Sequence, residues 1–169
     1  MEVWLAARRV SLGFLSGIVV LVLARPTWAT WGIGLVVALV GEVLRVWAAG
    51  HVDKGREVTR TGPYRWMRHP LYVGSMIMGA GVAIAGASLL AAVVIAVYMG
   101  VTILAAVRTE EAFLRRAFGE TYDRYRESCA EPMVRAFSLA RARRNRECRT
   151  ASGLVIGFAV LALKLLLPL

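Results

Sequence analysis

Two short polar motifs carry the residue types that bind a charged ligand. The first motif, RHPLYVG, covers Arg68 to Gly74 and places His69 before a proline that opens an apolar stretch. Proline suits the first position of a helix, because the N–H that it lacks has no helical acceptor there. The next N–H groups then form the positive end of the helix dipole, which attracts a carboxylate or phosphate. We expect an anion site at Leu71 to Val73, flanked by His69 and Tyr72, with room beside Gly74.

The second motif, EEAFLRRAFGETYDRY, runs from Glu110 to Tyr125. Adjacent carboxylates are unfavourable beside anionic lipid unless cations accompany them. The arginines near this glutamate pair give one explanation, simple surface ion pairing, by Arg108, Arg115 and Arg116. The other explanation is a receptor for a cationic ligand. An anion site and two carboxylates brought side by side would suit a ligand that carries both charges.

An anchoring role is the alternative for the first motif. In that interpretation Arg65 and Arg68 bind lipid phosphates, while Tyr64, Trp66 and Tyr72 form an aromatic belt at the membrane interface. An anchor alone does not require the ordered combination of a Gly-Pro turn, an Arg-His-Pro sequence and a glycine one turn later.

Hydropathy predicts a helical membrane protein. The chain has 169 residues, is 58% hydrophobic, and contains no charged residue between Pro70 and Val107. A helix crosses a hydrocarbon core of about 30 Å with about 20 residues. As one helix this stretch would reach roughly 57 Å, so it must fold back, and residues 86–88 are the natural turn. We predict a single all-α, polytopic transmembrane bundle over residues 1–169, with about five spans at residues 10–24, 28–49, 70–86, 88–107 and 150–169.

Positive charge predicts the orientation of this bundle. The chain carries 21 Lys and Arg and a net charge of +10. With a cytoplasmic N-terminus, 18 of these 21 residues fall in segments on the cytoplasmic side. Residues 51–68 and the cofactor-site and basic segment 108–149 then lie together in the cytoplasm. We expect an integral protein of the cell inner membrane, with its chemistry facing the cytoplasm.

Three polar residues accompany the apolar segments. Glu42 and Arg45, three residues apart in the second span, can pair on one helix face, as a structural bridge or as part of a polar cavity. His51 follows that span and either lines the same cavity or is a solvated loop residue. Lys164 lies near the end of the last span and can extend to the interface.

Several functions are not supported by the sequence. Cys129 and Cys148 show no CxxC or Cys/His spacing, so we expect neither a metal site nor a disulfide. The nucleotide-binding patterns GxGxxG and GxxxxGK[ST] do not occur. The segment 135–149 is rich in arginine, but no nucleic-acid recognition module accompanies it. Beside a span, the expected partner is anionic lipid of the inner leaflet, not nucleic acid.

Taken together, the two motifs resemble the isoprenylcysteine carboxyl methyltransferase family and the related phospholipid methyltransferases. The shared pattern is G-x-Y, R-H-P-x-Y-x-G, an apolar hairpin, and E-E-x-x-L-x-x-x-F-G-x-x-Y-x-x-Y, across about residues 45–128. It is met here by Gly62, Tyr64, Arg68 to Gly74, Glu110, Glu111, Leu114, Phe118, Gly119, Tyr122 and Tyr125. Family members commonly end soon after this pattern, whereas this chain adds a basic linker and a last span.

The resemblance implies an integral membrane enzyme that binds S-adenosyl-L-methionine on the cytoplasmic side. It implies cofactor contacts by Tyr64, His69, Pro70, Leu71, Tyr72, Gly74, Glu110 and Glu111. Catalytic roles would fall to Arg108, which would hold an acceptor carboxylate, and to Glu111. Substrate contacts are expected from His51, Tyr122, Tyr125 and Arg126.

The expected acceptor is a lipophilic or lipidated substrate that enters sideways from the bilayer. Small residues at Gly74, Gly79, Gly81 and Ala83 either leave a cleft for it or allow close helix packing, which is the better explanation for Gly79 and Gly81. The expected reaction is O-methylation of an isoprenylcysteine-like carboxylate, which needs no general base. A phospholipid amine acceptor would need one, with Glu111 or His51 as candidates. Lower-ranked alternatives are a nicotinamide-dependent membrane reductase and a non-catalytic membrane scaffold.

Overall fold

A computed structural model of the chain describes residues 2–129, 131 and 133–167, with side chains from Gly13 onward. This part is all-helical and contains no strand, as the sequence predicts. Its elements are α1 (Glu2–Leu23), α2 (Trp28–His51), the 3-10 turn η1 (Gly62–Arg65), α3 (Pro70–Gly86), α4 (Leu89–Phe118), α5 (Glu120–Arg126), α6 (Leu139–Arg144) and α7 (Glu147–Leu166).

Three of these helices, α2, α4 and α7, are long and apolar enough to cross a membrane. Helix α3 and residues 13–23 of α1 are shorter apolar helices. Helix α4 continues well beyond the predicted span at residue 107, because the charged segment after it has no helix breaker before Gly119.

Local signals explain where the helices begin and turn. Thr27 precedes α2, and its side chain and that of Thr30 form a reciprocal capping box. Helix α3 ends at Gly86, Ala87 adopts a left-handed conformation with φ 46°, and the Ser88 hydroxyl caps α4 by accepting from the N–H of Ala91. The turn predicted at residues 86–88 is therefore confirmed.

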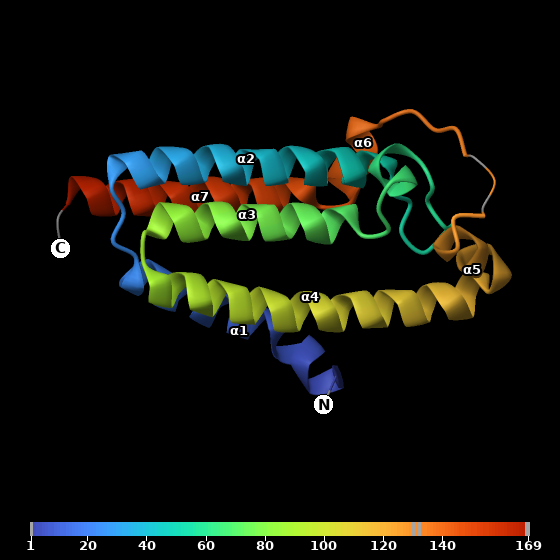
Figure 1. The fold of residues 1–169 in the computed structure, drawn as a ribbon, viewed down its shortest axis with the longest axis horizontal. Helices are drawn as coiled ribbons and strands as arrows, with labels where there is room; N and C mark the ends of the chain where they lie inside the picture. The colour runs from blue at the N-terminus through green and yellow to red at the C-terminus, as the bar shows by residue number, and fades with distance from the viewer. Residues whose placement is uncertain (1, 130, 132, 168–169) are drawn as a thin grey trace.

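Figure 1 shows α2, α3 and α7 running side by side, while α4 and α1 form a separate pair. Helices α2 and α3 approach closely because glycines face each other: a Cβ on Gly81 would lie 2.5 Å from the backbone N of Ala38. Likewise a Cβ on Gly74 would lie 2.7 Å from the carbonyl oxygen of Gly41. The open space predicted beside Gly74 is thus wrong, since α2 fills it.

Helix α7 packs on the same layer through polar as well as apolar contacts. The Trp31 indole N–H donates to the carbonyl of Phe158, 3.0 Å away. The Lys164 ammonium donates to the carbonyls of Leu21 and Val22 at 2.9 and 3.1 Å. The unpaired carbonyls at the end of α1 attract the cation.

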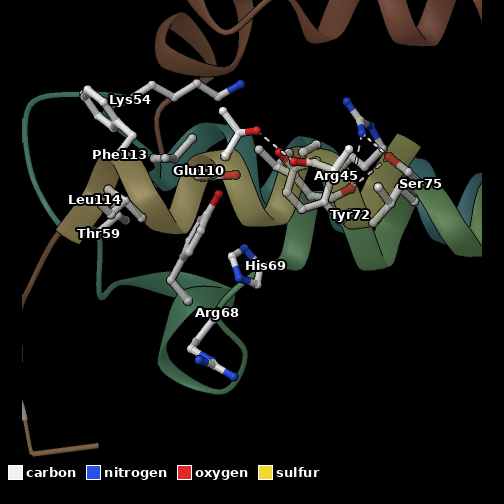
Figure 2. Close-up of a pocket in the computed structure, with 18 of the residues that line it drawn as sticks. Arg45, Lys54, Thr59, Arg68, His69, Tyr72, Ser75, Glu110, Phe113 and Leu114 are labelled. Carbon is white, nitrogen blue, oxygen red and sulfur yellow. Dashed lines mark hydrogen bonds between the residues drawn. The ribbon is translucent and has the colours of Figure 1, made fainter. Parts of the chain in front are cut away.

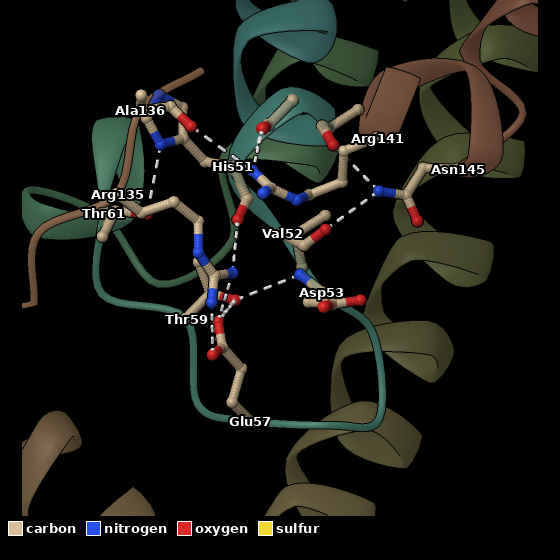
Figure 3. A network of polar contacts seen from close by, with 12 residues as sticks. His51, Val52, Asp53, Glu57, Thr59, Thr61, Arg135, Ala136, Arg141 and Asn145 are labelled. Atoms are coloured by element: carbon tan, nitrogen blue, oxygen red, sulfur yellow. Dashed lines mark hydrogen bonds and ion pairs between the residues drawn. The ribbon is translucent and has the colours of Figure 1, made fainter. Parts of the chain in front are cut away.

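The basic segment after α5 closes the far end of α2 (Figure 3). Arg141 Nη1 donates to the carbonyl of Gly50 at 2.6 Å, and Asn145 Nδ2 donates to those of Ala49 and Val52 at 2.8 and 3.0 Å. Arg135 pairs with Glu57 at 2.6 Å and also reaches the His51 carbonyl. These side chains satisfy carbonyls that a helix end leaves unpaired. Other arginines of the segment stay exposed: Arg143, Arg144, Arg146 and Arg149.

The alternating directions of the long helices bring their polar connections together. Helices α2 and α4 end, and α3 and α7 begin, at the same end of the bundle (Figure 1). The loop 52–69 and the segment 119–146 therefore meet there, as the charge distribution predicts. This end holds the candidate site.

Candidate functional site

A cavity of about 850 Å³ separates α3 from α4. At the polar end of the bundle it is lined by Lys54, Arg68, His69, Glu110, Tyr122 and Tyr125. Further along, its lining is mainly apolar and comes largely from α4, with Met99, Val101, Ile103 and Ala106. Figure 2 shows the polar part, where α3 begins opposite the last turns of α4. The cavity thus joins an ionic end to an apolar end.

The two sequence motifs meet at His69 and Glu111. His69 Nε2 lies 3.1 Å from Glu111 Oε1, and Arg68 Nη1 lies 3.6 Å from the same oxygen. The predicted approach of the two motifs is confirmed. The prediction that the nearby arginines neutralise the glutamate pair is wrong. The ion-pair partners of Glu111 are Arg68 and His69 of the first motif, and Arg115 instead pairs with Asp123 at 3.6 Å.

The two adjacent glutamates have different surroundings. Glu111 is held by His69 and Arg68, whereas Glu110 is half-buried, lines the cavity, and has no ion pair with any residue that the structure describes. Consecutive residues on a helix point in directions about 100° apart, so only one of the pair can face His69. Glu110 is therefore the carboxylate available to a ligand.

The first turn of α3 exposes fewer amides than predicted. The N–H groups of Tyr72 and Val73 both donate to the His69 carbonyl at 3.1 Å. Of the three amides expected to be free, only that of Leu71 keeps no acceptor among the described residues. Leu71 lines the cavity and Pro70, although buried, does not. The anion site at this helix end is thus a single N–H with the dipole behind it.

Three tyrosines close the polar end of the cavity. The Tyr125 hydroxyl donates to the Tyr64 carbonyl at 2.7 Å, and burial raises the pKa of Tyr125 to about 12. Burial also raises the pKa of Tyr64 above its usual value. Tyr122 is 1% exposed, and its hydroxyl has no hydrogen-bond partner among the described residues. Burial, with the nearby Glu111 charge, raises the pKa of Tyr122, so all three hydroxyls stay neutral at physiological pH.

The Tyr122 side chain lines the cavity, and its hydroxyl lies near the Glu111 carboxylate. A polar ligand atom in the cavity would be a second polar neighbour for this hydroxyl. The sequence predicts substrate contacts by Tyr122 and Tyr125, and both side chains line the cavity.

Arg45 is a cavity residue whose partner the sequence did not reveal. Its guanidinium binds Glu147 at the start of α7, with Nη2 2.9 Å from Oε1 and Nε 3.2 Å from Oε2. The remaining group, Nη1, donates to the Leu71 carbonyl at 3.2 Å and to the Ser75 hydroxyl. The predicted Glu42–Arg45 pair is wrong: both carboxylate oxygens of Glu42 are buried without a hydrogen bond among the described residues. The sequence signal that could have identified Glu147 as this partner is its position, since it is a single acidic residue at the start of the last apolar segment.

Other predicted site residues lie elsewhere. His51 is 6% exposed, and its Nδ1 lies 3.1 Å from the Thr61 hydroxyl, so it neither lines the cavity nor sits in a solvated loop. Arg108 is exposed on α4, outside the cavity lining. Gly74 faces α2. Arg126 lines a second, smaller cavity behind Tyr64 and Tyr125. Of the acidic residues that line the first cavity, Glu57 pairs with Arg135, which leaves Glu110 as the direct ligand candidate, while Glu111 lies beside the cavity residue His69.

A comparison with known proteins identifies the family of this chain. A family model described as phospholipid methyltransferase matches residues 27–121. The chain belongs to this family, and with its three helices of membrane-spanning length it is an integral membrane protein.

Individual relatives are more distant. Protein-S-isoprenylcysteine O-methyltransferase A of Arabidopsis thaliana is 30% identical over 133 residues, which cover 70% of this chain and 66% of that protein. A probable protein-S-isoprenylcysteine O-methyltransferase of Oryza sativa subsp. indica is 31% identical over 110 residues, 58% of each chain. The cobalt-zinc-cadmium resistance protein CzcN of Cupriavidus metallidurans is 35% identical over 98 residues, 56% of this chain and 44% of that one. The chain thus spans about half to two thirds of the length of these relatives. No solved structure is significantly similar to it.

Proposed function

We propose that the chain is a membrane methyltransferase that uses S-adenosyl-L-methionine to methylate a lipid-borne acceptor. The first candidate acceptor is the carboxylate of an isoprenylcysteine-like substrate. The observation that carries the proposal is the continuous cavity between α3 and α4, which is ionic at one end and apolar at the other. The names of the plant relatives support the same reaction.

The polar end fits the methyl donor. The donor has a carboxylate, an ammonium group and a sulfonium, so it needs both an anion site and a carboxylate partner. The free Leu71 N–H and Arg68 would hold its carboxylate, and Glu110 its ammonium group. Tyr122 offers a hydroxyl at the cavity, beside Glu111, to a polar ligand atom. The cavity volume of about 850 Å³ lies within the usual range of ligand pockets, roughly 300–1,000 Å³.

The apolar end fits a lipid chain. Met99, Ile103 and Ala106 line it, and Val101 is both part of the lining and exposed on the outer surface of α4. The cavity wall therefore reaches the surface that a membrane-spanning α4 presents to lipid. A hydrocarbon chain lying there would carry its reactive head towards the ionic end.

The proposed reaction depends more on the alignment of donor and acceptor than on proton transfer. The bound donor supplies an electrophilic methyl group, and the acceptor must approach it in line. A dry cavity favours the meeting of a carboxylate and a sulfonium, because their charges cancel towards the transition state. Lys54, which lines the cavity, would hold an acceptor carboxylate in place of Arg108, which lies outside the lining. Glu111, hydrogen-bonded to His69, keeps the donor end in place.

N-methylation of a phospholipid amine is the second candidate, favoured by the family match. An amine must lose a proton, and Glu111 or the free Glu110 would accept it. The alternative base His51 is buried beside Thr61 and does not line the cavity.

The positive-inside distribution supports a cytoplasmic location for the polar end, in the inner membrane of the cell. The exposed Arg143, Arg144, Arg146 and Arg149 would then face anionic lipid of the inner leaflet.

The reaction is tested with the full chain in liposomes, methyl-labelled donor, and two acceptors, a prenylcysteine analogue and phosphatidylethanolamine. A base-labile labelled ester supports O-methylation, and a base-stable amine supports N-methylation. Thr102→Phe, which fills the apolar lining, should lower transfer at least about tenfold while S-adenosylhomocysteine still binds. Leu104→Phe on the exposed face of α4 is the matched control and should transfer normally. Absence of label on both acceptors would reject the proposed acceptor class.

A further inference from the structure

A second cavity of about 410 Å³ lies at the polar end of the bundle, behind the wall formed by Tyr64 and Tyr125. Its lining contains four arginines and one glutamate, Arg60, Arg65, Arg68, Arg126 and Glu131. These five side chains leave an excess of three positive charges around one small space. Like charges gathered without counter-charges repel one another, so the arrangement favours an anion.

The arginines of this cavity have few ion-pair partners among the described residues. Arg60, Arg65 and Arg126 form no ion pair with any residue that the structure describes, and Arg68 makes only the 3.6 Å contact with Glu111. The Nε of Arg60 is buried and has no hydrogen-bond partner among the described residues. A buried donor on a charged group is costly to leave unpaired. Guanidinium groups match phosphate oxygens in a two-bond geometry, which makes phosphate a natural occupant.

The position of the cavity indicates where such a phosphate comes from. Trp66 lines the cavity, is 72% exposed, and lies against Trp47, with ring centroids 5.7 Å apart. Trp47 is in the last two turns of α2, a helix long enough to span a membrane. Exposed tryptophans at the end of a span mark the level of lipid headgroups. The arginine cavity therefore opens at the depth at which lipid phosphates are found.

We infer that the arginine cavity binds the phosphate of an anionic membrane lipid, separately from the methyl-donor cavity. The two sites share a wall, because Tyr64, Arg68 and Tyr125 line both and the Tyr125 hydroxyl bonds the Tyr64 carbonyl. A lipid held in the second cavity thus buttresses the polar end of the first. The inference goes beyond the proposed reaction, and its test does not require activity.

The test measures lipid binding to the delipidated full chain in neutral detergent, by native mass spectrometry. Phosphatidylglycerol should bind at least about tenfold more tightly than phosphatidylcholine, whose choline cancels the phosphate charge. Arg60→Gln combined with Arg65→Gln should weaken phosphatidylglycerol by about tenfold or more. The matched control, Arg108→Gln with Arg116→Gln, removes the same charge from exposed positions of α4 that line neither cavity, and it should weaken binding less than about threefold.

Two results would overturn the inference. Equal weakening by the cavity and control variants would mean that general surface charge attracts the lipid. Inorganic phosphate that competes as well as the lipid would mean that the site takes free phosphate. Because Arg60 is partly buried, Arg65→Gln alone, at an exposed position, is the second variant and should still weaken binding several-fold if the double variant does not fold.

Discussion

Helix α3 has two different neighbours. Against α2 it packs backbone to backbone, through glycines whose added Cβ atoms would strike main-chain atoms. Against α4 it leaves a cavity of about 850 Å³. The small residues of α3 thus allow close packing on the side that faces α2. On the side that faces α4, His69, Tyr72 and Ser75 line the cavity.

The difference shows how a short helix can position a site. The tight α2–α3–α7 layer, fixed by Arg45 and Glu147, gives the first turn of α3 a fixed position. The looser α4 can then supply a wall that need not touch α3 along its whole length. Changes on the packed side should therefore affect folding, and changes on the cavity side should affect binding.

The largest effect is expected from breaking the Arg45–Glu147 ion pair, which joins α2 to α7. Glu147→Ala leaves the buried Arg45 guanidinium without its carboxylate, which should cost about 3–5 kcal/mol in the free energy of unfolding. Unfolding in mixed detergent micelles measures this. Arg45→Met combined with Glu147→Leu should recover part of the loss, because neither member of the pair is then left without its partner. A single variant as stable as wild type would show that the pair does not hold the layer.

Two glycines of α3 compare its two sides directly. Gly81→Ala would press a methyl group on the backbone of α2 and should lower the free energy of unfolding by about 1–3 kcal/mol. A Cβ on Gly79 would meet the end of the flexible Met99 side chain, which borders the cavity and can move, and would lie in ordinary contact with Ile95 Cγ2 at 3.4 Å. Gly79→Ala should be neutral or stabilising by up to about 1 kcal/mol. Equal losses in the same unfolding assay would contradict the contrast between the two sides.

Removal of the Tyr122 hydroxyl should separate binding from stability. Tyr122→Phe deletes a buried hydroxyl that makes no close hydrogen bond and lies near the Glu111 carboxylate, so the free energy of unfolding should change by less than about 1 kcal/mol. If the ligand uses this hydroxyl, S-adenosylhomocysteine should bind about three- to tenfold more weakly. Tyr72→Phe, which removes the hydroxyl of another tyrosine in the cavity lining, serves as the comparison variant. An unaltered affinity would show that no ligand reaches Tyr122.

The smallest effect concerns pH. Burial raises the pKa of Tyr125 to about 12 from an ordinary value of about 10, so the folded state keeps the proton longer than the unfolded state. The contribution of Tyr125 to stability is therefore complete below about pH 10 and is lost as pH rises towards 12. Tyrosinate absorbance of wild type minus Tyr125→Phe should show a group titrating near pH 12. A difference near pH 10 would mean that this end of the cavity is open to water.

The sequence predicted the helices better than the contacts between them. Hydropathy and the Pro70 and Gly86–Ser88 signals located α3 and its turn, because these are local properties of the chain. The meeting of His69 with Glu111 followed from folding back the hairpin. The Arg45–Glu147 pair did not follow, since those residues are far apart in the chain and the i, i+3 partner Glu42 was the nearer candidate.

The sequence also did not predict which of the expected site residues are buried and which are exposed. His51 and Arg108 were expected at the site from residue type, yet one is enclosed beside Thr61 and the other is exposed on α4. Gly74 was expected beside a ligand and instead lies against α2. A glycine pattern does not say which neighbour fills the space, because that depends on how helices distant in sequence pack.

The central claim is that the cavity between α3 and α4 binds the methyl donor, with Glu110 as its free carboxylate. Calorimetry of the detergent-solubilised chain with S-adenosylhomocysteine tests it most directly. Wild type should bind, and Glu110→Gln should bind at least about tenfold more weakly, while the exposed Glu120→Gln control on α5 should match wild type. No binding by wild type, or equal binding by the two variants, would contradict the account.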